Sequence, residues 1–382
     1  MPNHFRKGLI AVSSAALFAA CAVAADRAPA TVSLKDVFKG DFVVGAAINA
    51  GQITGQDRRG DAIVEAQFNS ISPENALKWE RVHPLLGEYD FRLADRYVEF
   101  GREHGMFIVG HNLVWHSQVP AWVFRDSKGD LLSRDALLAR MRDHISTVVG
   151  RYKGKIQSWD VVNEALNEDG TMRQSMWEKI IGDDYVAKAF EYAHQADPRA
   201  QLTYNDYDLE NPAKRKGAIA LIEKLQAEGV PITSVGLQNH DNLTTPTAEQ
   251  EDATISAFGA LGLKVAISEL DIDVLPAAGR QDTADVNFHV AQNPKLNPYV
   301  NGLPKAVQQE LARRYADLFR VFVNHAGVVT RVTFWGVTNR DSWLNNRPVR
   351  GRTNYPLLFG RDGEPTPAFD AVVNTAARDG DR

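Results

Sequence analysis

The stretch Gln157-Ser158-Trp159-Asp160-Val161-Val162-Asn163-Glu164-Ala165-Leu166 decides how this chain folds. Its tryptophan and two valines favour a buried strand, and that strand would end at Asn163 and Glu164. A carboxylate seldom follows a buried apolar run unless it faces a pocket or a charged partner. Glu164 is therefore either a catalytic acid or half of a salt bridge at the strand end, and this stretch alone favours neither.

The same arrangement recurs along the chain: an apolar run, then polar residues, then an amphipathic helix. Eight runs are predicted to be strands, at 42–48, 70–74, 107–115, 156–163, 201–205, 234–238, 264–270 and 329–335. The clearest helices are predicted at 135–152, 184–196, 214–228 and 304–325, with Pro304 in the first turn of the last. Strands alternating with helices predict parallel strands and right-handed crossovers. We therefore expect an α/β fold, a single-domain (β/α)8 TIM barrel with extended βα loops.

An open, doubly wound sheet is the competing fold. Such a sheet usually carries a glycine-rich turn for a dinucleotide after its first strand, and residues 49–55 lack that pattern. The longest irregular region runs from Asp273 to Gly302 and is rich in Pro, Asn and Ala. We expect this region to form a loop at the barrel mouth.

The N-terminus has the features of a secretory signal peptide. A positively charged start and an uncharged apolar stretch over 9–24 are followed by small residues that suit cleavage. Residues 1–25 are therefore assigned to a signal peptide and 26–382 to the barrel, and the protein is expected to be exported, secreted or periplasmic. The only cysteine, Cys21, lies in a stretch similar to a lipoprotein box, so a lipid anchor at Cys21 is the alternative.

Composition narrows the class of function. The 382 residues carry a net charge of −5 without a basic cluster, which argues against a nucleic-acid-binding protein. The apolar stretch near the N-terminus is short for a membrane span and no stop-transfer run follows it, so no transmembrane segment is expected.

In a TIM barrel the functional side chains lie at the carboxyl ends of the strands. Nearly every predicted strand end carries amide, carboxylate, imidazole or indole groups. The set comprises Glu74, Asn75, Lys78, His111, Trp115, Gln118, Asn163, Glu164, Asn205, Tyr207, Gln238, His240, Glu269, Asp271, Trp335 and Trp343. The polar groups suit sugar hydroxyls, and indoles cover the apolar faces of sugar rings. Phosphate recognition would instead need arginine or glycine-rich amides, so the set favours a sugar polymer.

Hydrolysis of a glycosidic bond needs two carboxyl groups, one to protonate the leaving oxygen and one to stay ionised. Glu164 and Glu269 end the fourth and seventh predicted strands, so they would face each other across the barrel mouth. A separation of about 5 Å between them would suit a double displacement through a covalent glycosyl-enzyme.

Several of these residues also have a structural interpretation. Trp335 could belong to the core, His116 could be a structural histidine, and Glu80 and Asp206 could pair with nearby cations. His111 and His116 are spaced wrongly for two metal ligands on one helix face. No metal or other cofactor is therefore expected.

Together these motifs strongly resemble glycoside hydrolase family 10, the endo-β-1,4-xylanases. The resemblance spans about 42–369 and rests on an ordered set of motifs: Glu74-Asn75-x-x-Lys78-Trp79, His111-x-Leu113-x-Trp115-His116-x-Gln118, Trp159-Asp160-Val161-Val162-Asn163-Glu164, Gly236-Leu237-Gln238-x-His240, Ser268-Glu269-Leu270-Asp271, and Trp335 with Trp343. It implies a secreted, retaining endo-β-1,4-xylanase that hydrolyses internal bonds of xylan. Xylan and xylo-oligosaccharides would be its partners, and we expect a monomer.

The resemblance also implies individual roles. Glu164 matches the acid/base and Glu269 the nucleophile, Asn163 would bond the sugar 2-hydroxyl, and His240 would bond Glu269 with Asp271 behind it. The implied contacts are Lys78, His111, Gln238 and Trp335 at the cleavage-site sugar, Glu74, Asn75, Gln118 and Trp343 with Trp115 as support at the next glycone site, and Asn205 and Tyr207 on the aglycone side.

Two other functions remain open at this stage. The protein could be a β-1,4-glucanase or a relative of mixed specificity, or a non-catalytic protein that binds polysaccharide in the same cleft. Ser268 stands where the family often has threonine, which keeps a hydroxyl. Asn239, Asp241 and Asn242 around His240 are less usual and leave the distal aglycone contacts open.

Overall fold

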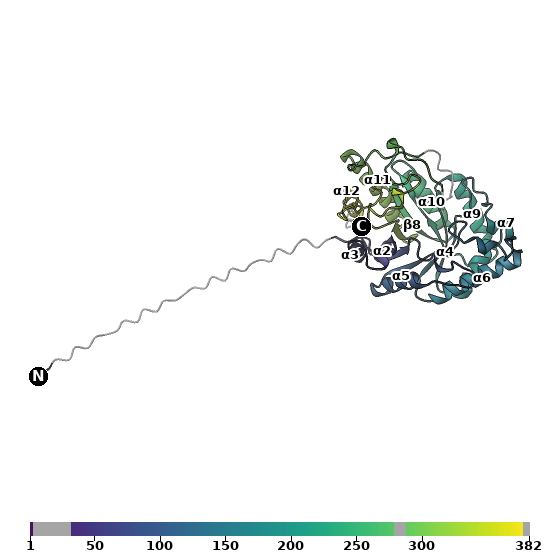
Figure 1. Ribbon diagram of the computed structural model, residues 1–382. Coiled ribbons are helices and arrows are strands. Elements are labelled where there is room, and N and C mark those ends of the chain that lie inside the picture. The colour runs from purple at the N-terminus through teal and green to yellow at the C-terminus, as the bar shows by residue number, and fades with distance from the viewer. Residues whose placement is uncertain (3–31, 279–287, 377–382) are drawn as a thin grey trace. The chain divides into compact units, whose positions relative to one another are not determined.

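The protein is represented by a computed structural model that describes residues 1–2, 32–278 and 288–376. Eight parallel strands form its centre: β1 (Val43–Ile48), β2 (Ser70–Pro73), β3 (Phe107–Val114), β4 (Ser158–Asn163), β5 (Gln201–Asp206), β6 (Ser234–Leu237), β8 (Lys264–Asp273) and β9 (Val329–Phe334). Strands adjacent in this order pair with each other, and β9 also pairs with β1, which closes the sheet into a barrel. The predicted (β/α)8 TIM barrel is confirmed (Figure 1).

Predicted and observed strands differ most at the seventh predicted one. It was expected to end at residue 270, but β8 continues to Asp273. It continues because a short additional strand, β7 (His240–Asn242), pairs with its outer end and places His240 opposite Asp271. The sequence interpretation missed β7, although β7 positions a predicted site residue. Smaller differences of one or two residues occur elsewhere, as at β4, which begins at Ser158.

Helices surround the strands (Figure 1). The longer ones are α3 (Arg58–Gln67), α5 (Arg92–Glu103), α6 (Arg134–Arg151), α8 (Tyr185–Ala196), α9 (Pro212–Ala227), α10 (Ala248–Ala260), α11 (Lys305–Asn324) and α12 (Pro367–Ala376). The short ones are α1 (Leu34–Val37), α2 (Ala50–Ile53), α4 (Trp79–Val82) and α7 (Met176–Ile181), with 3-10 turns η1 (Ala121–Phe124), η2 (Pro294–Leu296) and η3 (Trp343–Asn345). Pro304 was predicted inside the first turn of α11. It is instead the N-cap, with an extended ψ of 143°, and the helix begins one residue later.

Packing between β3 and β4 depends on a glycine. Trp159 is fully buried, and Gly110 lies opposite it in the paired strand. A Cβ at position 110 would lie only 2.1 Å from an atom of the Trp159 ring, so glycine leaves the room that the indole needs. A buried tryptophan contributes about 3–5 kcal/mol to stability. This contact holds β4 against β3 and thereby fixes where Asn163 and Glu164 emerge at the barrel mouth.

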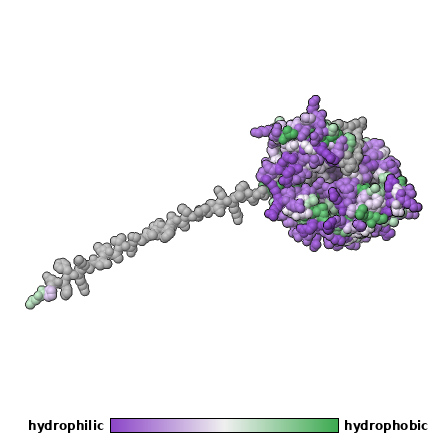
Figure 2. Space-filling model, viewed as in Figure 1, coloured by the Kyte–Doolittle hydropathy of each residue, from purple (hydrophilic) through white to green (hydrophobic). Residues whose placement is uncertain are grey.

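The long loop before α11 is irregular where it is described, as predicted. Residues 274–278 and 288–302 contain no regular element except the turn η2, and 279–287 lie outside the described residues. The assigned signal peptide, with Cys21, also lies almost wholly outside them. In the part of the chain that is described, no helix combines the length and apolar character needed to cross a membrane. The face in Figure 2 is mostly hydrophilic, with scattered apolar residues.

Candidate active site

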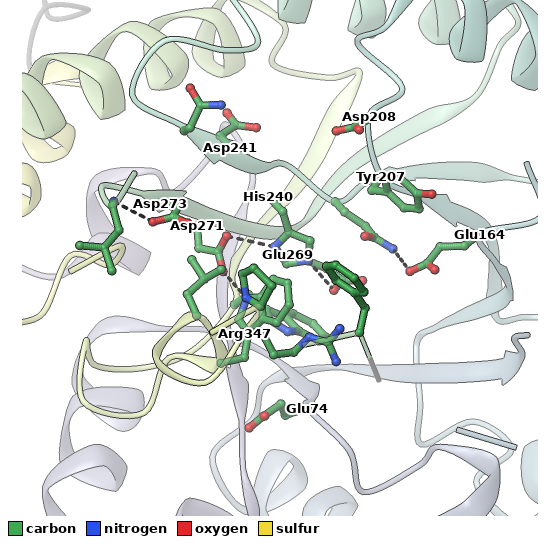
Figure 3. A pocket seen from close by; sticks show the side chains of 18 of the residues that line it. Glu74, Glu164, Tyr207, Asp208, His240, Asp241, Glu269, Asp271, Asp273 and Arg347 are labelled. Atoms are coloured by element: carbon green, nitrogen blue, oxygen red, sulfur yellow. Dashed lines mark hydrogen bonds and ion pairs between the residues drawn. The ribbon is translucent and has the colours of Figure 1, made fainter. Parts of the chain in front are cut away.

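A pocket of about 980 Å³ opens at the carboxyl ends of the strands (Figure 3). Fifteen of the sixteen predicted site residues line it: Glu74, Asn75, Lys78, His111, Trp115, Gln118, Asn163, Glu164, Tyr207, Gln238, His240, Glu269, Asp271, Trp335 and Trp343. The sixteenth, Asn205, lies beneath it. Segments that are far apart in the sequence meet here because all the parallel strands end at the same rim of the barrel.

Glu269 lies within β8 and is almost fully buried. Its Oε1 accepts a hydrogen bond from Asn205 Nδ2 at 2.8 Å, and its Oε2 lies 3.3 Å from His240 Nε2. Burial alone would raise the pKa of Glu269. The hydrogen bond from His240, the proximity of His111 and His240, and the hydrogen bond from Asn205 outweigh burial and lower that pKa below its ordinary value. The carboxylate is thus held ionised inside the barrel.

His240 connects Glu269 to a second carboxylate. Its Nδ1 lies 3.0 Å from Asp271 Oδ1, and Asp271 Oδ2 accepts a hydrogen bond from Trp343 Nε1 at 2.6 Å. Burial would lower the pKa of His240, but its charge interactions and hydrogen bonds with Asp271 and Glu269 raise the pKa to about 10. His240 is therefore an imidazolium at neutral pH, and both of its ring nitrogens donate.

The raised pKa of His240 predicts a loss of stability in alkali. The ordinary value is 6.5 and the folded value is about 10, so the stabilisation is complete below pH 6.5 and is lost as the pH rises through about 10. We expect the protein to melt several degrees above a His240→Gln variant near pH 6, and this difference to shrink steadily toward pH 10.5. Thermal unfolding of both proteins across this pH range measures it. A Tm difference that stays constant with pH would contradict the assignment.

Glu164 follows β4 directly and is 7% exposed. Three donors surround its carboxylate: Trp115 Nε1 at 2.8 Å from Oε2, and Asn163 Nδ2 and Gln238 Nε2 each at 3.0 Å from Oε1. Its backbone φ of 56° is in the left-handed region, which non-glycine residues rarely adopt. The surroundings therefore fix both the side chain and the backbone of this residue.

Asn205 and Asn163 link the two carboxylates. Asn205 Nδ2 donates to Asn163 Oδ1 at 2.7 Å as well as to Glu269, and Asn163 Nδ2 donates to Glu164. Ser268 Oγ donates to Asn205 Oδ1 at 2.6 Å, which fixes the orientation of that amide. Asn205 is 0% exposed and its amide bonds Asn163 and Glu269, so the structure places it beneath the pocket lining. Its predicted contact with the aglycone sugar stays a prediction.

The pocket wall formed after β2 and β3 is built around a buried lysine. Lys78 Nζ donates to Asn75 Oδ1 at 3.1 Å and to Gln118 Oε1 at 2.8 Å, and it lies 5.0 Å from the Trp115 ring centroid. Burial lowers the pKa of Lys78, with nearby carboxylates including Glu74 acting against it. Burial also raises the pKa of Glu74. Amide, ammonium and carboxyl groups thus line this wall at fixed positions.

The floor of the pocket contains His111 and Trp335. His111 Nδ1 lies 2.9 Å from Asp160 Oδ2, and its ring meets the Trp335 ring edge-on at 5.3 Å. Trp335 is 7% exposed and lines the pocket, so it belongs to both the core and the site. Asp160 was not predicted as a site residue. A carboxylate between Trp159 and Val161 in a buried strand was the signal that it has a polar partner.

The opposite wall is formed after β5. Tyr207 lines the pocket, and its hydroxyl bonds both Glu168 and Arg173. The preceding Asp206 is buried and pairs with Lys214 at 2.9 Å, as its structural interpretation expected. It also accepts hydrogen bonds from the Tyr204 hydroxyl and the Tyr207 N–H. Burial raises the pKa of Asp206 to about 6, with Lys214 acting against this shift.

Further residues that were not among the sixteen predicted ones also line the pocket. They are Glu80, Asp208, residues 241–244, 273–277 and 347–348, Phe288, Tyr299 and Leu344. Residues 273–277, Phe288 and Tyr299 of the long loop region line the pocket, as expected for a loop at the barrel mouth. His116, interpreted as structural, is absent from the lining, and its Nε2 is 4.0 Å from Glu164 Oε2. Among the described residues, no three His, Cys, Asp or Glu side chains are grouped to hold a metal ion.

The model of glycosyl hydrolase family 10 matches residues 33–375. This chain belongs to glycosyl hydrolase family 10. Among curated proteins, endo-1,4-beta-xylanase A of Xylanibacter ruminicola is 43% identical over 341 residues, which cover 89% of this chain and 92% of that protein. Endo-1,4-beta-xylanase of Geobacillus stearothermophilus is 40% identical over 346 residues, which cover 90% and 98% respectively.

Solved structures of similar proteins have the same architecture. An endoxylanase retrieved from a sugarcane soil metagenome is 43% identical and gives a TM-score of 0.86, covering 90% of this chain and 99% of that one. A mutant structure in complex with xylotriose is 36% identical with a TM-score of 0.79, covering 90% and 100%. As a member of family 10, this chain is a glycoside hydrolase.

Proposed function

We propose that this protein is a retaining endo-β-1,4-xylanase. Glu269 attacks the anomeric carbon while Glu164 protonates the leaving glycosidic oxygen, which forms a covalent glycosyl-enzyme. Glu164 then takes a proton from water, and that water attacks the anomeric carbon, releases Glu269 and restores the original configuration. Asn163 holds the sugar 2-hydroxyl beside the bond that is cleaved.

One observation carries this proposal: the two buried carboxylates have different surroundings. Glu269 contacts the imidazolium of His240, and its pKa is lowered, as a nucleophile requires. The carboxylate of Glu164 instead accepts its described hydrogen bonds from neutral donors, those of Trp115, Asn163 and Gln238. When two carboxyl groups of one site have different surroundings, one can act as the acid and the other as the nucleophile.

The substrate class is proposed from the pocket and the relatives. Three indole rings, those of Trp115, Trp335 and Trp343, and many hydroxyl-binding groups line the pocket. The relatives compared above are named endo-1,4-beta-xylanases, and one similar structure contains xylotriose. Xylan and xylo-oligosaccharides are therefore the proposed substrates, and the enzyme is proposed to act as a monomer without a cofactor. We also propose export through the signal peptide over 1–25, with a lipid anchor at Cys21 as the alternative.

Side-by-side hydrolysis of xylan and carboxymethyl cellulose tests the substrate. Glucose units carry a hydroxymethyl group that xylose lacks, and walls near Trp343 and Gln118 would exclude it. Exclusion of one small group is worth about 1–3 kcal/mol, so we expect xylan to be preferred by about tenfold or more in kcat/KM. Equal rates on both polymers would favour the mixed-specificity alternative. Binding of xylan without release of reducing ends would favour a non-catalytic binding protein.

A further inference from the structure

Arg173 contacts both the backbone of Glu164 and the pocket wall at Tyr207. Its Nε donates to the Glu164 carbonyl oxygen at 3.1 Å. Its Nη2 donates to the Leu166 carbonyl oxygen at 2.7 Å and to the Tyr207 hydroxyl at 2.8 Å. One side chain that does not line the pocket therefore connects two residues that do.

The local sequence explains why Arg173 lies there. After Glu164 the chain forms a tight hairpin, in which Leu166 pairs with Met172 and Arg173 N–H donates to the Ala165 carbonyl at 2.8 Å. At the hairpin tip, Gly170 has a φ of 82° and approaches α9 closely. A Cβ on Gly217 of α9 would lie 2.1 Å from the Gly170 carbonyl oxygen, so the contact requires glycine. The hairpin is thus packed against α9, and its last residue returns to the backbone of Glu164.

The backbone of Glu164 needs such support. Its φ of 56° is unfavourable for a glutamate and persists only where neighbouring groups hold it. The Glu164 N–H donates to the Asn205 carbonyl at 2.9 Å, and the Glu164 carbonyl accepts from Arg173. Because the direction of the Glu164 carboxyl depends on this backbone conformation, the Arg173 hydrogen bond helps to fix where the acidic proton is delivered.

Tyr207 is also held rigidly. Its hydroxyl donates to Glu168 and accepts from Arg173, and Lys214 Nζ lies 3.3 Å from its ring centroid. Glu164 and Tyr207 lie on the same side of the pocket in Figure 3, away from Asp271 and Asp273. Arg173 therefore fixes the acid relative to this wall.

We propose that Arg173 is a positioning residue for proton donation by Glu164 to the leaving sugar. The inference rests on the proposed function, in which Glu164 is the acid. Misplacing a reacting group by about 1 Å can cost on the order of 10²-fold in rate. The loss should appear only where the leaving group needs a proton, because a good leaving group departs as an anion without acid assistance.

The test compares two substrates in an Arg173→Met variant. We expect kcat/KM for xylohexaose, whose leaving group is a sugar alcohol, to fall on the order of 10²-fold. For 2,4-dinitrophenyl β-xylobioside, kcat/KM reports only the first step, glycosylation of the enzyme. That step needs no acid with this leaving group, so we expect kcat/KM to change by less than about threefold. Arg173→Lys keeps the charge, but lysine cannot reach all three acceptors. Its kcat/KM for xylohexaose should therefore lie between those of Arg173→Met and the native protein. If Arg173→Met does not fold, the same comparison of the two substrates is made with Arg173→Lys.

Two reference variants separate the possible outcomes. Arg140 also binds backbone carbonyls, those of Trp122, of Val123 at 3.3 Å and of Arg125 at 2.8 Å, but among the described contacts it has no hydrogen bond to Glu164. Arg140→Met should leave both substrates within about twofold of native activity, as for a residue away from the site. Equal losses on both substrates in Arg173→Met, or no loss on either, would overturn the inference. If Glu164→Ala itself lacks the dependence on leaving group, the proposed function fails instead.

Discussion

Glu269→Ala is expected to abolish nearly all xylan hydrolysis while the barrel remains folded. Removing the nucleophile from a set of catalytic residues that act together lowers kcat on the order of 10⁴–10⁶-fold. The substitution deletes a buried carboxylate whose partners, His240 and Asn205, keep other contacts with Asp271 and Asn163. The change should therefore affect catalysis far more than folding. Reducing-sugar release from xylan measures the activity, and thermal unfolding measures the fold.

The products with azide make this experiment specific to Glu269. In the alanine variant, azide can attack the anomeric carbon from the side that the nucleophile would have used, which inverts the configuration and gives an α-glycosyl azide. A matched control is Glu80→Gln, which removes another acidic group of the same pocket, one that accepts a hydrogen bond from Gln118 at 3.1 Å. The xylan activity of this control should fall by no more than about tenfold, which is the effect expected from the loss of one hydrogen bond. Full xylan activity in Glu269→Ala would refute the assignment of the nucleophile.

The barrel could be predicted from the sequence because its signals are local and repeated. Each strand is an apolar run that ends in polar residues, and each clear helix has one apolar face, so eight repeats fix the architecture. The strand β7 had no such signal. Three residues, His240, Asp241 and Asn242, form it through pairing with the outer end of β8, and pairing between distant segments leaves no periodic pattern in a segment so short.

The positions of the site residues could be predicted better than the directions of their side chains. Asn163 and Asn205 are partners in register on β4 and β5, and the sequence places both at the barrel mouth. Only the fold reveals that Asn205 is directed inward, because Gly236 on β6 leaves space where a Cβ would lie 2.1 Å from Asn205 Oδ1. A shift of one residue at a strand end reverses the direction of a side chain, so strand ends alone could not decide this.

Arg173 could not have been identified from sequence for a different reason. Its function depends on the hairpin that follows Glu164 and on the left-handed backbone of Glu164, and neither leaves a composition signal at residue 173. Asp160 is the opposite case, since a carboxylate in a buried apolar strand implies a partner, and His111 is that partner.

Glu164→Ala is expected to separate substrates by their leaving groups. General acid catalysis contributes about 10²–10⁴-fold, so xylan and xylo-oligosaccharides should lose activity by that factor. In contrast, kcat/KM for 2,4-dinitrophenyl β-xylobioside should stay near the native value, because the phenolate leaves without a proton. The kcat for the same substrate should still fall, since Glu164 is also the base that activates water in the second step.

Azide should restore turnover of the aryl substrate in Glu164→Ala, with a product of defined configuration. Azide is anionic and needs no base, so it attacks the glycosyl-enzyme on Glu269 directly and gives a β-glycosyl azide. The β product from Glu164→Ala and the α product from Glu269→Ala would together assign the two carboxylates, because each configuration reports which group remains. Proton NMR of the glycosyl azide distinguishes the two. An α-azide from Glu164→Ala would reverse the roles proposed for Glu164 and Glu269.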